Sequence, residues 1–211
     1  MNFENLLQLI GKEPVFSSGL LLSGKISQPQ IRLQLSRWVK AGRLQQIRRG
    51  LYLPAPAWRK VEPHPFLVAN RMQPGSYVSL QSALAFHGLI PEHVPVVTSV
   101  GPGRGEEIST PLGRFKFNHI ADSLLYGYSE QEIAGNQTAF IATPEKALLD
   151  LVYMTPGADS IEYLRELRLQ DIASLSSEAL LRLAARSGKP KLKRTAAMAN
   201  ELAMEEQGDV L

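Results

Sequence analysis

Cysteine is absent from the 211 residues of this chain, which excludes disulfide bonds, thiolate metal sites and cysteine nucleophiles. Long apolar runs are also absent, since no stretch of about eighteen apolar residues is available to cross a bilayer. Glu4 stands before any apolar stretch, unlike the start of a secretory signal. We therefore expect a cytoplasmic protein without a membrane partner, whose apolar content of 44% suits an ordinary globular core.

Carboxylates are scarce at the N-terminal end. Residues 1–60 contain ten Lys and Arg against two Asp and Glu, whereas residues 61–211 contain 13 against 18. No carboxylate lies between Pro14 and Val61, a stretch that holds nine of the basic residues. A local excess of this kind neutralises phosphates and releases their counterions. The segment is therefore expected either to bind nucleic acid or to be a solvated basic face.

Three helices are expected in the first forty residues. Apolar residues recur at steps of three and four over residues 3–10, which predicts the first helix. A second, brief helix is expected over residues 20–22, before Gly24. Ser27 and Gln30 have the spacing of a capping box, so a third helix is expected to begin there with good definition.

This third helix is expected to bury one side and to expose a basic side. Ile31, Leu35, Trp38 and Val39 form the inward stripe, and at 100° per residue the remaining side chains point outward. Arg bonds guanine bidentately, Gln bonds adenine, and an apolar side chain meets either a thymine methyl or another part of the protein. The expected DNA-facing residues of the helix are Gln28, Gln30, Arg32, Leu33, Ser36, Arg37 and Lys40.

A two-stranded hairpin is expected to follow. Residues 44–48 alternate with strand period, a turn is available at 49–50, and residues 51–53 return before Pro54. Arg48 and Arg49 are expected at its tip, where they reach a flanking phosphate or the minor groove. Residues 1–60 therefore predict a winged helix-turn-helix domain that binds double-stranded DNA.

The proline-rich stretch around residues 54–65 predicts a domain boundary near residue 60. Residues 61–211 are expected to form a C-terminal domain, with mixed α/β structure over 61–155 and helices over 156–211. The predicted fold class is α+β. The strands expected in the mixed part are residues 94–100, 115–120 and 139–142.

Three segments of the chain carry a resemblance to a known family. They are WVKAGRLQQIRRGLYLP at residues 38–54, YVSLQSALAFHGLIPE at 77–92 and ATPEKALLDLVY at 142–153. In this order and spacing they resemble the AbiEi antitoxins of bacterial type IV toxin–antitoxin (abortive infection) systems, and the resemblance covers most of the chain. It implies a transcriptional autorepressor that binds its own promoter. It also implies a C-terminal domain that suppresses a cognate nucleotidyltransferase toxin, with or without direct contact.

A second basic cluster lies near the C-terminal end. We expect it either to touch DNA, RNA or an acidic partner, or to be a solvated loop and helix start. Its residues are Arg186, Lys189, Lys191, Lys193 and Arg194.

The sequence predicts no enzyme, no cofactor and no metal site. The four histidines lack paired spacing on one helix face, and residues 101–105 are expected to form a hairpin loop rather than a phosphate loop. Glu145 is explained by the helix dipole, and Asp150 lies about 140° away from it round the helix. A metal-dependent nuclease would need an Asp/Glu-x-Lys pattern on a strand, which we do not find. The alternatives are a stand-alone effector-responsive regulator, with a ligand pocket in the glycine-rich sheet region, and a DNA-directed nuclease.

Overall fold

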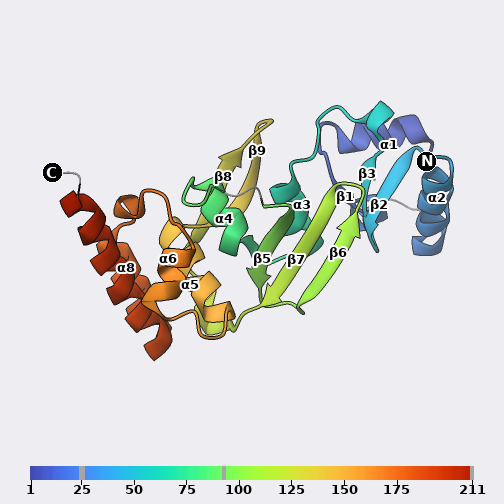
Figure 1. Ribbon diagram of the computed structural model, residues 1–211. Helices are drawn as coiled ribbons and strands as arrows, with labels where there is room; N and C mark the ends of the chain where they lie inside the picture. Colours follow the sequence, from blue (N-terminus) through green and yellow to red (C-terminus); the bar gives the residue numbers. More distant parts are fainter. Residues whose placement is uncertain (24–26, 92–93, 210–211) are drawn as a thin grey trace.

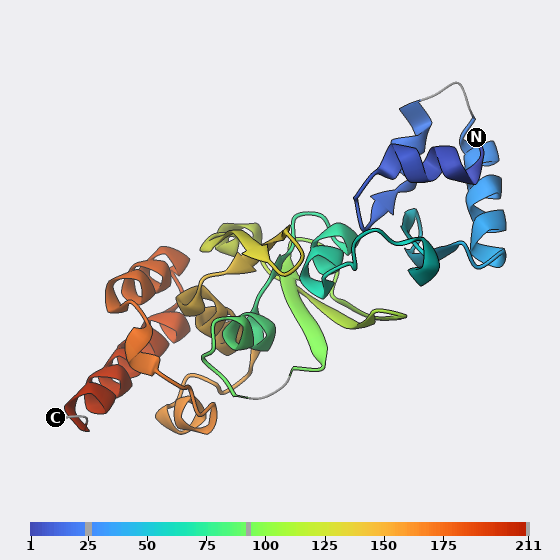
Figure 2. The same ribbon diagram turned by 90° about the horizontal axis from the view of Figure 1, so that it is seen from above.

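The computed structural model describes residues 1–23, 27–91 and 94–209. Gly24, Lys25 of the basic segment and His93, one of the four histidines, lie outside the described residues. Three parts follow one another along the molecule, with the chain ends at opposite extremes (Figures 1 and 2). An N-terminal group of helices with a small sheet comes first, a larger sheet lies in the middle, and the C-terminal helices form the other end. The fold is α+β, as predicted.

The helices take their positions from apolar spacing and from capping residues. Asn2 caps the helix that begins at Phe3 by accepting from the backbone N–H of Asn5 at 2.8 Å. Thr143 caps the helix that begins at Pro144 in the same way. The α-helices are α1 (Phe3–Ile10), α2 (Gln28–Lys40), α3 (Pro65–Met72), α4 (Leu80–Phe86), α5 (Pro144–Met154), α6 (Ile161–Glu166), α7 (Ser177–Ser187) and α8 (Pro190–Asp209). Short 3-10 helices are η1 (Ser18–Ser23), η2 (Pro56–Trp58), η3 (Asp122–Leu124) and η4 (Ile172–Ser174).

The strands form a small and a large sheet. The small sheet is antiparallel, in the order β1-β3-β2, and the large sheet is mixed, in the order β6-β7-β5-β4-β9-β8. The strands are β1 (Phe16–Ser17), β2 (Leu44–Arg48), β3 (Leu51–Pro54), β4 (Tyr77–Val78), β5 (Val96–Gly101), β6 (Glu106–Thr110), β7 (Gly113–His119), β8 (Tyr128–Ile133) and β9 (Gln137–Ala142).

The hairpin of β2 and β3 has a short turn and an irregular register. Arg48 pairs with Leu51, so Arg49 and Gly50 form the turn, and Gly50 adopts the left-handed region at φ +81°. The register shifts between Gln46 and Arg48, which is the signature of a β-bulge. The hairpin is tied to the preceding segment because the N–H of Ser18 donates to the carbonyl of Gly50 at 2.8 Å.

The small sheet is buried on both faces. Leu44 and Tyr52 belong to an N-terminal core with residues of α1 and α2, such as Leu6 and Leu35. Ile47, Leu51 and Leu53 instead join the main core of the large sheet and the C-terminal helices, as does Val15, which precedes β1. The boundary near residue 60 therefore separates two segments of sequence, but the apolar packing is continuous across it.

The glycine-rich segment 101–105 does not form the predicted hairpin loop. Strand β5 pairs with β7 in parallel, and β6 pairs with the outer side of β7, so the segment crosses over to the edge of the sheet. Its glycines allow close packing: a Cβ on Gly103 would lie 2.7 Å from the side chain of Gln73, and one on Gly101 would lie 2.9 Å from Ser76.

Candidate nucleic-acid interface

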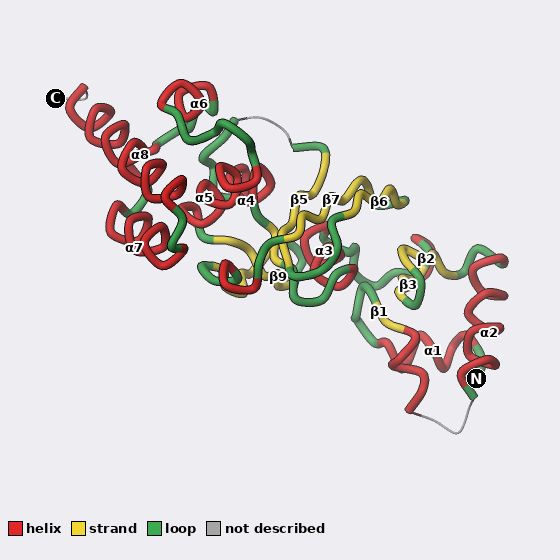
Figure 3. The backbone as a smooth tube through the Cα atoms, turned by 90° about the horizontal axis from the view of Figure 1, so that it is seen from below, coloured by secondary structure: helices red, strands yellow, loops and turns green. Residues whose placement is uncertain are grey.

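Helix α2 lies at one end of the molecule, across the small sheet from the large one (Figure 3). Its Ile31, Leu35 and Trp38 are buried, as the apolar spacing predicted. Its first turn is fixed because the N–H of Ser27 donates to Oε1 of Gln30 at 3.3 Å. All seven residues predicted to face DNA are exposed: Gln28, Gln30, Arg32, Leu33, Ser36, Arg37 and Lys40.

The exposed basic residues of α2 lie on two flanks. At about 100° per residue, Arg32 and Arg37 point about 140° apart round the helix, with Leu33 and Lys40 between them. Arg32 faces the hairpin, because it lines the same hollow as Arg49. Arg37 is therefore on the flank turned away from the hairpin.

The hollow between α2 and the hairpin has a volume of about 420 Å3. Arg32 and Arg49 line it together with Ser18, Gly50 and Tyr52, and none of these described residues is acidic. Burial raises the pKa of the Tyr52 phenol, and the positive charge of Arg32 opposes that rise. The sequence-based prediction missed Ser18 and Tyr52, since their contribution depends on where η1 and β3 meet the turn.

Arg48 was predicted to reach a flanking phosphate or the minor groove from the tip of the hairpin. In the structure its side chain instead contacts the large-sheet part of the molecule. Its guanidinium donates to the backbone carbonyl of Met72 at 3.0 Å and pairs with Glu106 at 2.8 Å. Met72 ends α3 and Glu106 begins β6, so both partners belong to the large-sheet part of the molecule. Arg49, its neighbour in the turn, is exposed and has no ion-pair partner among the described residues.

The second basic cluster is divided in the structure. The guanidinium of Arg186 lies over an aromatic ring, 4.3 Å from its centroid, and Lys191 donates to a backbone carbonyl at 2.6 Å. Arg194 pairs with Asp159 and lowers the pKa of that carboxyl. Three of the five residues therefore bind neighbouring elements. Within the described parts of the chain, Lys189 and Lys193 are exposed with neither an ion pair nor an aromatic contact, and Arg186 is exposed but contacts the aromatic ring.

A buried polar network joins two of the segments on which the family resemblance rests. Lys146 and Asp150 form an ion pair within α5, and both side chains are almost fully buried. Asp150 also accepts hydrogen bonds from the hydroxyls of Tyr77 at 3.0 Å and Ser79 at 2.8 Å. Burial raises the pKa of Asp150, and the ammonium of Lys146 opposes part of that rise. Leu80, which follows Ser79 in the sequence, adopts φ +57°, a backbone conformation that is costly for a residue with a side chain of this size.

The network is internal rather than open to a substrate, since Ser79 is 0% exposed and Asp150 2% exposed. Glu145 is buried as well and accepts from the backbone N–H of Ser176 at 3.0 Å. Its role is therefore not limited to the helix dipole that the sequence suggested.

Within the described residues, no group of three His, Asp or Glu side chains is placed to hold a metal ion. No helix of the described residues is long and apolar enough to span a membrane.

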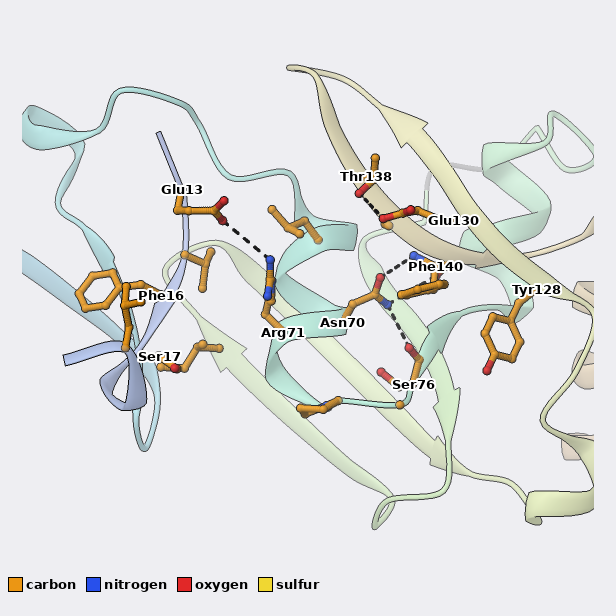
Figure 4. A pocket seen from close by; sticks show the side chains of 17 residues that line it. Glu13, Phe16, Ser17, Asn70, Arg71, Ser76, Tyr128, Glu130, Thr138 and Phe140 are labelled. Atoms are coloured by element: carbon orange, nitrogen blue, oxygen red, sulfur yellow. Dashed lines mark hydrogen bonds and ion pairs between the residues drawn. The ribbon is translucent and has the colours of Figure 1, made fainter. Parts of the chain in front are cut away.

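A cleft of about 950 Å3 lies between the N-terminal part and the large sheet. Figure 4 shows Asn70 and Arg71 on α3 in its middle, with Phe16 on one side and Phe140 on the other. Arg71 pairs across the cleft with Glu13 at 3.8 Å. Further lining residues include apolar or aromatic ones, Val15, Leu20, Leu51, Leu67, Pro74, Tyr128 and Ala139, and polar ones, Ser17, Ser76, Glu130 and Thr138.

In comparisons with known proteins, no family model matches the sequence and no curated protein matches it. Among known structures, the chain is similar to the crystal structure of the RV2827C protein from Mycobacterium tuberculosis, with a TM-score of 0.53. The match covers 95% of this chain and 78% of that chain at 16% sequence identity. At this identity the likeness concerns the fold alone, and it extends over both the N-terminal and the C-terminal parts.

Proposed function

We propose that residues 1–60 are a winged helix-turn-helix that binds double-stranded DNA, with α2 as the recognition helix and the β2–β3 hairpin as the wing. The observation that carries this proposal is the state of the basic residues on this end of the molecule. Arg32, Arg37, Lys40 and Arg49 are exposed and have no ion-pair partner among the described residues. By contrast, Arg48, Arg59 and Arg194 each pair with a carboxylate. Unpaired positive charge on an exposed helix suits a polyanion.

We further propose that the protein is an autorepressor in the cytoplasm and an antitoxin against a cognate nucleotidyltransferase. The support is the sequence resemblance described above. Two of its three segments meet at Asp150, since Tyr77 and Ser79 come from one and Lys146 from the other. In this proposal the buried network maintains the C-terminal part that suppresses the toxin, and it has no catalytic role.

Binding of the protein to DNA from upstream of its own gene tests the first proposal. Arg37→Ala is expected to lower specific affinity by about 1–3 kcal/mol, the magnitude of one bidentate bond to a base. Affinity for a duplex of shuffled sequence should change much less. Equal affinity of the unsubstituted protein for the two duplexes would show that binding is not directed by sequence.

Co-expression tests the antitoxin proposal. An adjacent gene for a nucleotidyltransferase is expected to arrest growth when expressed alone, and the full chain should restore growth. Arg37→Ala should restore growth equally well when both genes are expressed from unrelated promoters, because suppression is assigned to the C-terminal part. Continued arrest in the presence of the unsubstituted chain would contradict the antitoxin proposal.

The cleft of Figure 4 favours a second function, that of an effector-responsive regulator. Ligand sites commonly lie between domains, are lined mainly by apolar side chains and contain a few polar groups. Its aromatic walls, Phe16 and Phe140, suit an aromatic ligand, and the carboxylates of Glu13 and Glu130 beside the paired Arg71 favour one without negative charge. The uncharged fluorescent probe N-phenyl-1-naphthylamine is therefore expected to bind there, to bind less tightly to Phe140→Ser, and to alter operator affinity. If it binds Phe140→Ser unchanged or leaves operator affinity unaltered, the cleft is not an effector site.

A further inference from the structure

The turn of the hairpin and one flank of α2 bring two positive charges to the same hollow. Arg32 comes from the second turn of α2, and Arg49 comes from the tip of the hairpin. The position of Arg49 is fixed on two sides, because Gly50 permits the turn at φ +81° and the N–H of Ser18 holds the Gly50 carbonyl at 2.8 Å. The backbone of the fold therefore places both arginines at the lining of the same hollow.

Nothing acidic within the described structure neutralises this pair of charges. The lining contains no carboxylate, and neither Arg32 nor Arg49 has an ion-pair or hydrogen-bond partner in residues 1–23, 27–91 or 94–209. Bringing two cations together without a counterion is unfavourable, so the arrangement calls for an anion from outside. Guanidinium groups match the geometry of phosphate oxygens, and the hydroxyl groups of Ser18 and Tyr52 lie in the same lining.

We propose that Arg32 and Arg49 together hold one backbone phosphate of the bound duplex. The inference rests on the proposed DNA binding and changes the role expected for Arg32. Arg32 positions α2 on the duplex and carries no sequence information, whereas Arg37, on the opposite flank of α2, is left to read a base. The hollow lies where α2 meets the hairpin, so a phosphate held there fixes the depth and the angle at which α2 enters the groove.

The salt dependence of binding distinguishes the two roles. For duplex DNA, the slope of log K against log salt changes by about 0.9 for each phosphate that the protein neutralises. Arg32→Ala and Arg49→Ala are each expected to reduce the slope by less than one on both the operator and the shuffled duplex, because the remaining arginine still neutralises part of the shared phosphate charge. Arg37→Ala is expected to keep the slope and to lower the preference for the operator roughly 10- to 100-fold.

The double variant Arg32→Ala/Arg49→Ala tests whether the phosphate is shared. A single shared phosphate predicts that the double variant loses about one unit of slope, which is more than either single variant loses. A loss of about two units would mean separate phosphates and would overturn the shared site. Lys12→Ala is the control for loss of charge, because Lys12 is exposed and lies outside the hollow. Its slope should equal that of the unsubstituted protein.

Failure of this inference is distinguishable from failure of the proposed function. If the unsubstituted protein binds DNA and the slope of the double variant is unchanged, only the phosphate site is wrong. If the unsubstituted protein binds no DNA, the proposed function is wrong. The phosphate site is then tested separately by NMR titration of the protein with inorganic phosphate. Shifts of the Ser18 and Gly50 amide signals that disappear in the double variant would support the phosphate site, and their absence would overturn it.

Discussion

His64 shows at the residue scale how one side chain couples local structure to pH. Its Nδ1 accepts the N–H of Phe66 at 3.1 Å and so caps α3, while its backbone N–H donates to the side chain of Gln137 at 2.9 Å. The ring is half-buried, and burial lowers its pKa below the ordinary value. Protonation is therefore costly twice, because it charges a partly buried ring and removes the acceptor that caps the helix.

The sign of the resulting pH dependence follows from proton binding. Below about pH 6.5 the unfolded chain takes up a proton at His64 more readily than the folded chain, so stability falls as the pH is lowered through that value. We expect His64→Asn to keep a capping oxygen and to show a smaller fall in stability as the pH is lowered. Urea unfolding at pH 5.5 and pH 7.5 measures the difference. A fall in stability as large in His64→Asn as in the unsubstituted protein would show that His64 does not cause it.

At the scale of elements, Asp150 joins α5 to the junction of β4 and α4. Its carboxylate is shared by Lys146 on its own helix and by Tyr77 and Ser79 on the other segment. Asp150→Asn keeps an acceptor for both hydroxyls but leaves the ammonium of Lys146 buried without its countercharge. We expect this variant to lose about 3–5 kcal/mol of unfolding free energy.

A second substitution separates charge from hydrogen bonding in this network. Lys146→Met removes the unpaired ammonium, so the double variant Lys146→Met/Asp150→Asn should regain most of the missing stability. Urea unfolding of the single and double variants is the measurement. A double variant as unstable as Asp150→Asn alone would mean that the network depends on the hydroxyl groups or on helix packing rather than on the ion pair.

At the scale of the whole molecule, the N-terminal part depends on the rest of the chain for one of its buried faces. In residues 1–60 alone, Val15, Ile47, Leu51 and Leu53 would lack their neighbours in the main core. Each such side chain contributes about 1.5–3 kcal/mol when fully buried. We therefore expect the fragment 1–60 to lack a cooperative unfolding transition, as measured by circular dichroism during heating. A sharp transition in the fragment would show that this part folds independently.

The local sequence predicted the regular elements that carry a clear periodic signal. Buried residues at helical spacing and the capping pair Ser27 and Gln30 located α2, and alternation located β2. The strands β6 and β8 were missed. Both lie at the edges of the large sheet and are mostly polar, as in residues 128–132, so their sequences carry little apolar signal. Only pairing with β7 and β9 makes them strands.

The sequence by itself determined that the first sixty residues are basic and almost free of carboxylates, because charge is a property of residue type. The tertiary structure decided which of those charges are available. Arg48 and Arg49 are neighbours in sequence, yet Arg48 pairs with Glu106 at the start of β6, while Arg49 lies with Arg32 at an unpaired hollow. The physical reason is that the availability of a charge depends on the opposite charges that the fold brings within a few ångströms, and those come from distant parts of the chain.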